Sequence, residues 1–236
     1  MEKKELLNRI SDFIDELHLD CITNENADDK EYNIIKELDN YSIIKNNKEK
    51  FNFINKDGKI LSDTWFDYAS NFSEGFRLIK LNDKWNFINK DGKILSNIWF
   101  DYADDFYEGF GLVQLNNKYN FIDEQGKLLS NIWFDYCFDF NKGFALVLLD
   151  HKLNFIDKQG NLLSNIWFDY ADDFYDGLAI IKLDKWNFID TDGKILSKNW
   201  FDSVEIFNDD LALVKLDNKW GHIDKQGKFI NNDLFN

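Results

Sequence analysis

The sequence predicts an all-β protein built from tandem repeats of about 34 residues. An aromatic-Asn-Phe-Ile signature recurs at near-constant spacing, the hydrophobic period within each copy is two, and one glycine follows each copy at a fixed distance. A repeat this short cannot bury both faces of its own sheet, so neighbouring repeats have to stack. We predict antiparallel β-meander repeats stacked as a solenoid or superhelix. A closed propeller-like array is the alternative, although propeller blades usually need four strands and roughly 40–45 residues.

The copies of the signature divide most of the chain into units. They begin at Phe51, Trp85, Tyr119, Leu153, Trp186 and Trp220. The one shorter step falls where the sequence loses a residue at Asp184-Lys185, which places the deletion in a turn. Residues 41–236 are therefore assigned to the repeat array, and YSIIKNNKEK (41–50) is interpreted as the closing strand of an earlier partial unit.

Within a unit, the pattern predicts three strands and a connector. In the second unit, WNFIN (85–89) alternates as a strand, KDGK (90–93) forms a turn, and KILS (93–96) returns as a short second strand. The connector follows, and then FGLVQL (110–115) forms the third strand before an Asn/Asp-rich turn. Glycine holds the turn slot in every unit, which indicates a positive φ there. These glycines are Gly58, Gly92, Gly126, Gly160, Gly193 and Gly227.

Residues 1–40 are predicted to form a helical N-terminal cap. Leu6, Ile10, Phe13, Ile14 and Leu17 recur at helical spacing and give one apolar stripe. A partner-binding helix is the alternative reading. The segment lacks the apolar region of a signal peptide, and no apolar run approaches the roughly 20 residues of a membrane span, so we expect a soluble, cytoplasmic protein.

Composition narrows the class of partner. Aromatic residues make up 17% of the chain, which indicates a folded protein. Asp plus Glu total 43 against 28 Lys plus Arg, a net charge of −15, so nucleic acids and anionic membranes are poor partners and positively charged groups are good ones. Cys21 and Cys137 form no spaced motif and are expected to be thiols in a reducing compartment rather than a disulfide.

The connector NIWFDYADDFYEG (97–109) returns almost unchanged as NIWFDYADDFYDG (165–177). Compared across the units, its Trp-Phe-Asp is constant while the later carboxylates vary. The candidate binding residues are therefore Trp65, Asp67, Trp99, Asp101, Trp133, Asp135, Trp167, Asp169, Trp200 and Asp202. The carboxylate spacing matches no known calcium loop, and an aspartate at a fixed turn position more often caps backbone N–H groups, so no metal and no cofactor are predicted.

The Trp-Phe pairs leave one question open. Adjacent residues of an extended segment point to opposite sides, so one aromatic ring of each pair is expected to be buried and the other is free to form a repeated surface for sugars, choline-like cations or peptides. No catalytic residues are predicted. Near-equal repeats give no carboxylate the distinct environment that acid/base catalysis needs, and no nucleophile motif or phosphate loop is present.

The repeats resemble the WG (KWG) β-repeat family. Lys219-Trp220-Gly221-His222-Ile223-Asp224 matches its strand, and Phe100-Asp101-Tyr102-Ala103 followed by Phe106-Tyr107-Glu108-Gly109 matches its connector. The resemblance covers about four-fifths of the chain, with two departures: Asn replaces the family's Gly in five of six units, and the prolines usual after the Gly-Lys turn are missing. It implies a mostly bacterial interaction or scaffold module.

We therefore expect a non-enzymatic binding or scaffold protein. Its partner would be a protein with a basic surface or one complementary to aromatic rings. Carbohydrate or cell-wall recognition through a Trp/Tyr column is the alternative function, and a glycan-cleaving enzyme is disfavoured.

Overall fold

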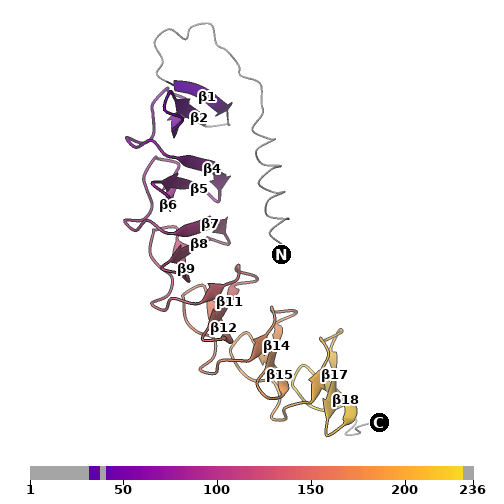
Figure 1. Ribbon diagram of the computed structural model, residues 1–236. Coiled ribbons are helices and arrows are strands. Elements are labelled where there is room, and N and C mark those ends of the chain that lie inside the picture. The colour runs from indigo at the N-terminus through magenta and orange to yellow at the C-terminus, as the bar shows by residue number, and fades with distance from the viewer. Residues whose placement is uncertain (1–31, 38–40, 231–236) are drawn as a thin grey trace. The chain divides into compact units, whose positions relative to one another are not determined.

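The computed structural model describes residues 32–37 and 41–230, which contain strands and turns and no helix. They form six three-stranded antiparallel sheets (Figure 1). The first three sheets are β1 (Tyr32–Glu37), β2 (Tyr41–Asn46) and β3 (Phe51–Asn55); β4 (Tyr68–Ser73), β5 (Phe76–Leu81) and β6 (Lys84–Asn89); and β7 (Tyr102–Tyr107), β8 (Phe110–Leu115) and β9 (Lys118–Asp123). The last three are β10 (Tyr136–Cys137), β11 (Phe144–Leu149) and β12 (Lys152–Asp157); β13 (Tyr170–Ala171), β14 (Leu178–Lys182) and β15 (Trp186–Asp190); and β16 (Ser203–Val204), β17 (Leu211–Leu216) and β18 (Lys219–Asp224).

The chain divides into two compact units, residues 1–69 and 70–236. In each sheet the strands pair in chain order, so every sheet is a meander. None of the described sheets closes into a barrel. The all-β, tandem-repeat prediction is confirmed.

Two details of the predicted repeat are wrong. KILS (93–96) is not a strand, because its only ladder contact is the single bridge from Ile94 to Ile88. The second half of the connector, to which no strand was assigned, is β7 and opens the next sheet. A meander therefore runs from one connector into the following signature strand, and the predicted unit boundary cuts across it.

A buried asparagine explains why the chain after the glycine turn is not a strand. The Asn86 side chain donates hydrogen bonds to the carbonyl oxygens of Ser96 (2.8 Å) and Ile98 (3.0 Å), and its own oxygen accepts from the N–H of Phe87 (2.8 Å). The amide thus takes carbonyl groups that a neighbouring strand would otherwise pair. The same bonds recur at Asn52, Asn120, Asn154 and Asn187. Asn at the family's Gly position is therefore a structural device of these repeats.

The loop also covers the outer edge of the sheet. Phe100 and Trp85 exchange two backbone hydrogen bonds of 2.8 Å, and the N–H of Leu95 donates to the carbonyl of Phe87 (2.8 Å). An open strand edge is a hazard for aggregation, and these bonds occupy it without a regular fourth strand.

The prediction of a helical cap is wrong for the part of residues 1–40 that the structure describes. Residues Tyr32–Glu37, within the predicted cap, form β1 and pair with β2. Pairing with an adjacent strand satisfies their backbone groups, which outweighs the helical preference assigned from the segment before them. The apolar stripe from Leu6 to Leu17 lies outside the described residues. Nowhere in the described part of the chain is there a helix long and apolar enough to span a membrane.

The turn predictions are confirmed. Gly92 has φ +81° and its N–H donates to the carbonyl of Asn89 (3.0 Å). The hairpins between the second and third strands of a sheet use pairs such as Asn82-Asp83, whose φ values of 50° and 62° are typical of the type I′ turn that matches strand twist. The one-residue deletion lies in the corresponding turn before Trp186, as expected.

In residues 70–236 the hydrophobic core lies between consecutive sheets. One cluster joins Leu78 and Phe87 of the β4–β6 sheet to Phe100, Phe106 and Val113 of the following segment. Phe106 stacks on Phe76 with 4.4 Å between ring centroids and meets Phe87 edge-on at 4.9 Å. Phe140, Phe174 and Phe207 make equivalent contacts. Within residues 70–236, consecutive sheets therefore stabilise one another, as the stacking argument requires.

Candidate functional site

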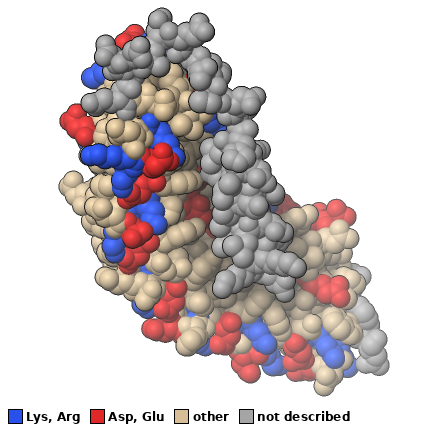
Figure 2. Space-filling view, turned by 45° about the horizontal axis from the view of Figure 1, so that its top comes forward, with Lys and Arg blue, Asp and Glu red and all other residues tan. Residues whose placement is uncertain are grey.

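The constant aspartate of the connector forms an ion pair in every repeat. Asp101 pairs with Lys84, the residue that opens the same repeat's signature strand. The other pairs are Lys50–Asp67, Lys118–Asp135, Lys152–Asp169 and Lys185–Asp202. Figure 2 shows acidic and basic side chains next to one another at intervals along the surface, the pattern that such pairs produce.

The same carboxylates also cap a turn, as the sequence predicted. The N–H of Asn116, in the next hairpin, donates to Asp101 (2.7 Å), and Asp150 donates likewise to Asp135 (2.7 Å). The hydrogen bond from Lys84, followed by the one from the Asn116 N–H, lowers the pKa of Asp101. Asp135 and Asp202 are lowered in pKa for the same reasons. These aspartates join two hairpins of one repeat.

The Trp-Phe pairs divide between core and surface. Phe66, Phe100, Phe134, Phe168 and Phe201 are completely buried, whereas the tryptophan before each of them is half-buried. Trp133, Trp167 and Trp200 lie against the inter-sheet cores. One ring of each pair is therefore committed to packing, as expected, and the tryptophan keeps a partly exposed edge.

Ligand binding by the ten sequence-predicted site residues stays a prediction. The structure pairs each Asp with a Lys, and it also bonds Asp101, Asp135 and Asp202 to a turn. It packs Trp133, Trp167 and Trp200 against the core. Among the described residues no group of three or more His, Cys, Asp or Glu side chains could hold a metal ion. Cys137 is a buried free thiol whose pKa is raised by burial, and Cys21 lies outside the described residues.

The more exposed aromatic residues come from the variable half of the connector, which the sequence reasoning set aside. Tyr107 is 58% exposed, Tyr175 57% and Phe138 45%. Tyr102, Tyr136 and Tyr170 hold equivalent positions in consecutive sheets and are each 40–42% exposed. We call the exposed side of these connector segments the connector face; its members are Tyr102, Asp104, Tyr107, Tyr136, Phe138, Asp139, Tyr170, Asp172, Tyr175, Glu205 and Ile206. Its signal in the sequence was aromatic residues at positions that the core does not use.

Carboxylates crowd the same face. Burial, and then the nearby charge of Asp104, raises the pKa of both Asp105 and Asp139. Asp104 and Asp139 belong to connectors of consecutive sheets, so the stacking of repeats brings these like charges together. A positively charged group at this face would relieve that repulsion.

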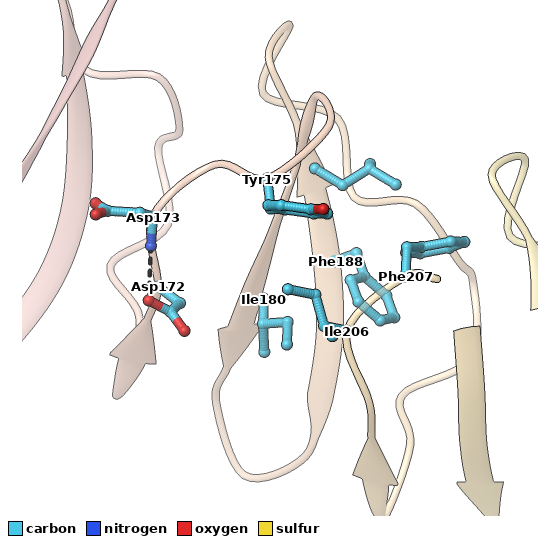
Figure 3. Close-up of a pocket in the computed structure, with 8 residues that line it drawn as sticks. Asp172, Asp173, Tyr175, Ile180, Phe188, Ile206 and Phe207 are labelled. Atoms are coloured by element: carbon cyan, nitrogen blue, oxygen red, sulfur yellow. Dashed lines mark hydrogen bonds between the residues drawn. The ribbon is translucent and has the colours of Figure 1, made fainter. Parts of the chain in front are cut away.

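Two hollows large enough to receive a side chain border the connector face. One hollow of about 440 Å³ is lined by Tyr107, Phe138, Asp139, Phe140, Asn141 and Asp173. A second, of about 350 Å³, is lined by Lys142, Tyr175, Asp176, Phe207 and Asp209. The cavity in Figure 3, between Tyr175, Phe188, Ile206 and Phe207, measures only about 20 Å³, which suffices for a single water molecule.

With the fold and these surfaces defined, the chain can be placed among known proteins. Its class is that of tandem β-repeat proteins. Residues 53–85, 87–119, 121–152, 155–185 and 186–220 match the family described as WG containing repeat. The chain belongs to this family. No curated protein matches it.

Three solved structures are distantly similar to this chain. BamB from Moraxella catarrhalis shares 10% identity, with 83% of this chain and 71% of that chain covered and a TM-score of 0.31. Hsv2p from Kluyveromyces lactis shares 11% identity, with coverage of 85% and 74% and a TM-score of 0.34. A protein of unknown function from Bacteroides caccae shares 15%, with coverage of 79% and 89% and a TM-score of 0.28. Scores this low carry no argument about function.

Proposed function

We propose that this protein is a non-enzymatic, cytoplasmic scaffold that binds another protein through the connector face, its repeats stacked as an open solenoid. One observation carries the proposal. The constant residues of the repeat serve the fold, whereas the variable residues place exposed aromatic rings beside carboxylates and over hollows of side-chain size. Exposed aromatic residues around a pocket are the typical energetic centre of a protein interface.

The charge of this face defines the complementary partner. Asp104, Asp139 and Asp172 are exposed beside the aromatic rings, and the whole chain carries a net charge of −15. Like charges across an interface are strongly unfavourable, so the partner surface should be basic. This is consistent with the partner expected from composition alone.

The test compares two matched triple variants. In the first, Tyr107→Ser, Phe138→Ser and Tyr175→Ser remove the exposed rings of the connector face. In the control, Ile98→Ser, Ile132→Ser and Ile166→Ser remove apolar side chains that are 36–42% exposed in the preceding loop. Partners are captured from the native cell with each protein and identified, and binding is then measured with purified components.

We expect a partner that binds the wild-type protein and the isoleucine variant equally and binds the aromatic variant at least tenfold more weakly, about 1.4 kcal/mol or more. Equal binding by all three proteins would remove the connector face from the proposal. Loss of binding in the isoleucine variant alone would move the interface to the loop.

Carbohydrate or cell-wall recognition is the second candidate. It is favoured by the equivalent, partly exposed rings of Tyr102, Tyr136 and Tyr170 in consecutive sheets. Co-sedimentation with cell-wall polysaccharide, together with tryptophan quenching by an added soluble glycan, tests this function. If the protein does not co-sediment and its fluorescence does not change, carbohydrate recognition is excluded and protein binding is the remaining proposal.

A further inference from the structure

Four of the six sheets share an internal cation–aromatic contact. A lysine on the middle strand lies directly opposite an aromatic residue on the third strand, and its ammonium group lies over that ring. The Nζ-to-centroid distances are 5.4 Å for Lys45 and Phe51, 5.4 Å for Lys80 and Trp85, 4.8 Å for Lys182 and Trp186, and 5.8 Å for Lys215 and Trp220. All fall within the range of a cation–π interaction, about 6 Å.

The β13–β15 sheet shows this contact in most detail. Tyr170, Lys182 and Trp186 are aligned across the three strands, so the lysine stands between two aromatic residues. The rings of Tyr170 and Trp186 are 5.4 Å apart, and the Tyr170 hydroxyl donates to Asp172 (3.3 Å). Two rings in contact, with the ammonium group over one of them and a carboxylate nearby, form a suitable environment for an ammonium ion.

The two central sheets lack this lysine. Gln114 occupies the position in the β7–β9 sheet, opposite Tyr102 on one side and Tyr119 on the other. Leu148 occupies it in the β10–β12 sheet, opposite Tyr136 and Leu153. The change from Lys to an uncharged residue therefore occurs in two consecutive sheets.

Aromatic residues are nevertheless in contact where these two sheets meet. The rings of Tyr119 and Tyr136 lie 5.2 Å apart although they belong to different sheets, and Phe138 meets Tyr136 edge-on at 4.9 Å. The Tyr102 hydroxyl donates to Asp104 (3.1 Å). Burial raises the pKa of both Tyr102 and Tyr136; the charge of Asp104 adds to the rise at Tyr102, and Tyr119 and then Asp139 add to it at Tyr136.

We propose that Tyr102, Tyr119, Tyr136 and Phe138, together with Asp104 and Asp139, bind the ammonium group of a lysine side chain of the partner protein. This ammonium site takes from the partner the group that four other sheets supply internally. Lysine is favoured over arginine because the residue at this register position is a lysine in each of those four sheets. The inference rests on the proposed protein-binding function and names the chemistry of its partner.

Binding is tested with a short Gly/Ser peptide that has one central lysine, with the same peptide carrying norleucine, and with one carrying arginine. Ring ¹H–¹³C spectra of tyrosine-labelled protein report on the site. We expect the lysine peptide to shift the Tyr119 and Tyr136 resonances saturably, the norleucine peptide to leave them unmoved, and the arginine peptide to bind more weakly. Tyr119→Leu, which copies Leu153 of the next repeat, should weaken lysine-peptide binding about threefold to tenfold.

Gln114→Lys provides the decisive variant, because it restores the internal lysine. It should abolish binding of the lysine peptide. Asn97→Lys adds the same charge at an exposed loop position, so it controls for the general attraction of an acidic protein for cations, and it should reduce binding by less than about twofold. Conversely, Lys182→Gln should open a second site, at Tyr170 and Trp186.

Three results would overturn the proposal: no shift with the lysine peptide, equal shifts with the lysine and norleucine peptides, or equal effects of Gln114→Lys and Asn97→Lys. Thermal melting of each variant establishes that it is folded. If the partner still distinguishes the aromatic from the isoleucine triple variant while the ammonium site fails, the protein-binding function stands and only this inference falls. If both triple variants bind the partner like wild type and the lysine peptide still binds, the ammonium site stands and the proposed protein-binding role of the connector face is wrong.

Discussion

The asparagine of the signature strand shows how one buried side chain defines a repeat. Asn86 is fully buried and bonds to two carbonyl oxygens and a backbone N–H, so every polar atom of its amide is in use. Ser96 adds a second local contact, because its hydroxyl accepts the N–H of Ile98 (3.1 Å). Together they hold the loop against the sheet without a proline.

Asn86→Ala should therefore destabilise the protein by about 2–4 kcal/mol, because it leaves buried carbonyl groups without donors. Urea unfolding measures the loss, and hydrogen exchange at β6 and its loop shows whether the effect is local. Asn97→Ala, at an exposed position of the same loop, is the control and should stay within about 0.5 kcal/mol of wild type. A cost of Asn86→Ala no larger than this control would contradict the structural role of the amide.

At the scale of the element, the glycine turn has two functions that the sequence cannot separate. Gly58 and Gly126 hold the same turn position with φ values of +79° and +81°. A Cβ atom at Gly58 would meet nothing within 4 Å, whereas one at Gly126 would lie 2.1 Å from the carbonyl oxygen of Leu95 in the preceding repeat. Gly160 and Gly193 approach Leu129 and Leu163 in the same way. The turn is therefore also a point of close backbone contact between repeats.

This difference gives a matched pair of variants. Gly58→Ala should cost about 1–2 kcal/mol, the strain of a left-handed conformation with a side chain. Gly126→Ala should cost about 1–3 kcal/mol more, because the backbone of the neighbouring repeat must also move. Both are measured by urea unfolding. Equal costs for the two variants would indicate that the contact with Leu95 is relieved without strain.

Across the whole molecule, the repeated carboxylates give stability a defined dependence on pH. The pKa values of Asp101, Asp135 and Asp202 are lowered in the folded state, so their contribution is present above the unfolded pKa, near 4, and is lost as the pH falls through the folded value. Asp105 and Asp139 have raised pKa values and act in the opposite direction: their charged forms oppose folding, and protonation relieves this.

Acidification below about pH 4 should therefore destabilise the Asp101→Asn variant less steeply than it destabilises the wild-type protein. Asp139→Asn, which copies the equivalent Asn71, should make the loss on acidification steeper and should raise stability at neutral pH. Urea midpoints at about pH 7 and about pH 3 measure both slopes. The same slope in all three proteins would show that these groups do not control acid stability.

Particular residues show which features of the structure could be predicted from the sequence. The glycine turns and the Asn82-Asp83 type of hairpin were predictable, because they depend on the φ preferences of one or two residues. The burial of Phe100 was predictable in kind, since adjacent residues of an extended segment face opposite ways. The burial of Phe106 was not predictable in this way, although phenylalanine holds its position in every connector (Phe72, Phe106, Phe140, Phe174 and Phe207), because it depends on contact with Phe76 and Phe87 of the preceding sheet.

The sequence by itself determined the repeat period, the β class, the turn positions and the structural use of the constant aspartates, since each follows from local periodicity or backbone conformation. Only the tertiary structure decided which strands share a sheet and which aromatic rings face solvent. Tyr102, Gln114 and Tyr119 are far apart in a repeat pattern read along the chain, and strand pairing places them side by side. Contact with Tyr136 then depends on the packing of the next sheet, a non-local interaction that no single repeat encodes.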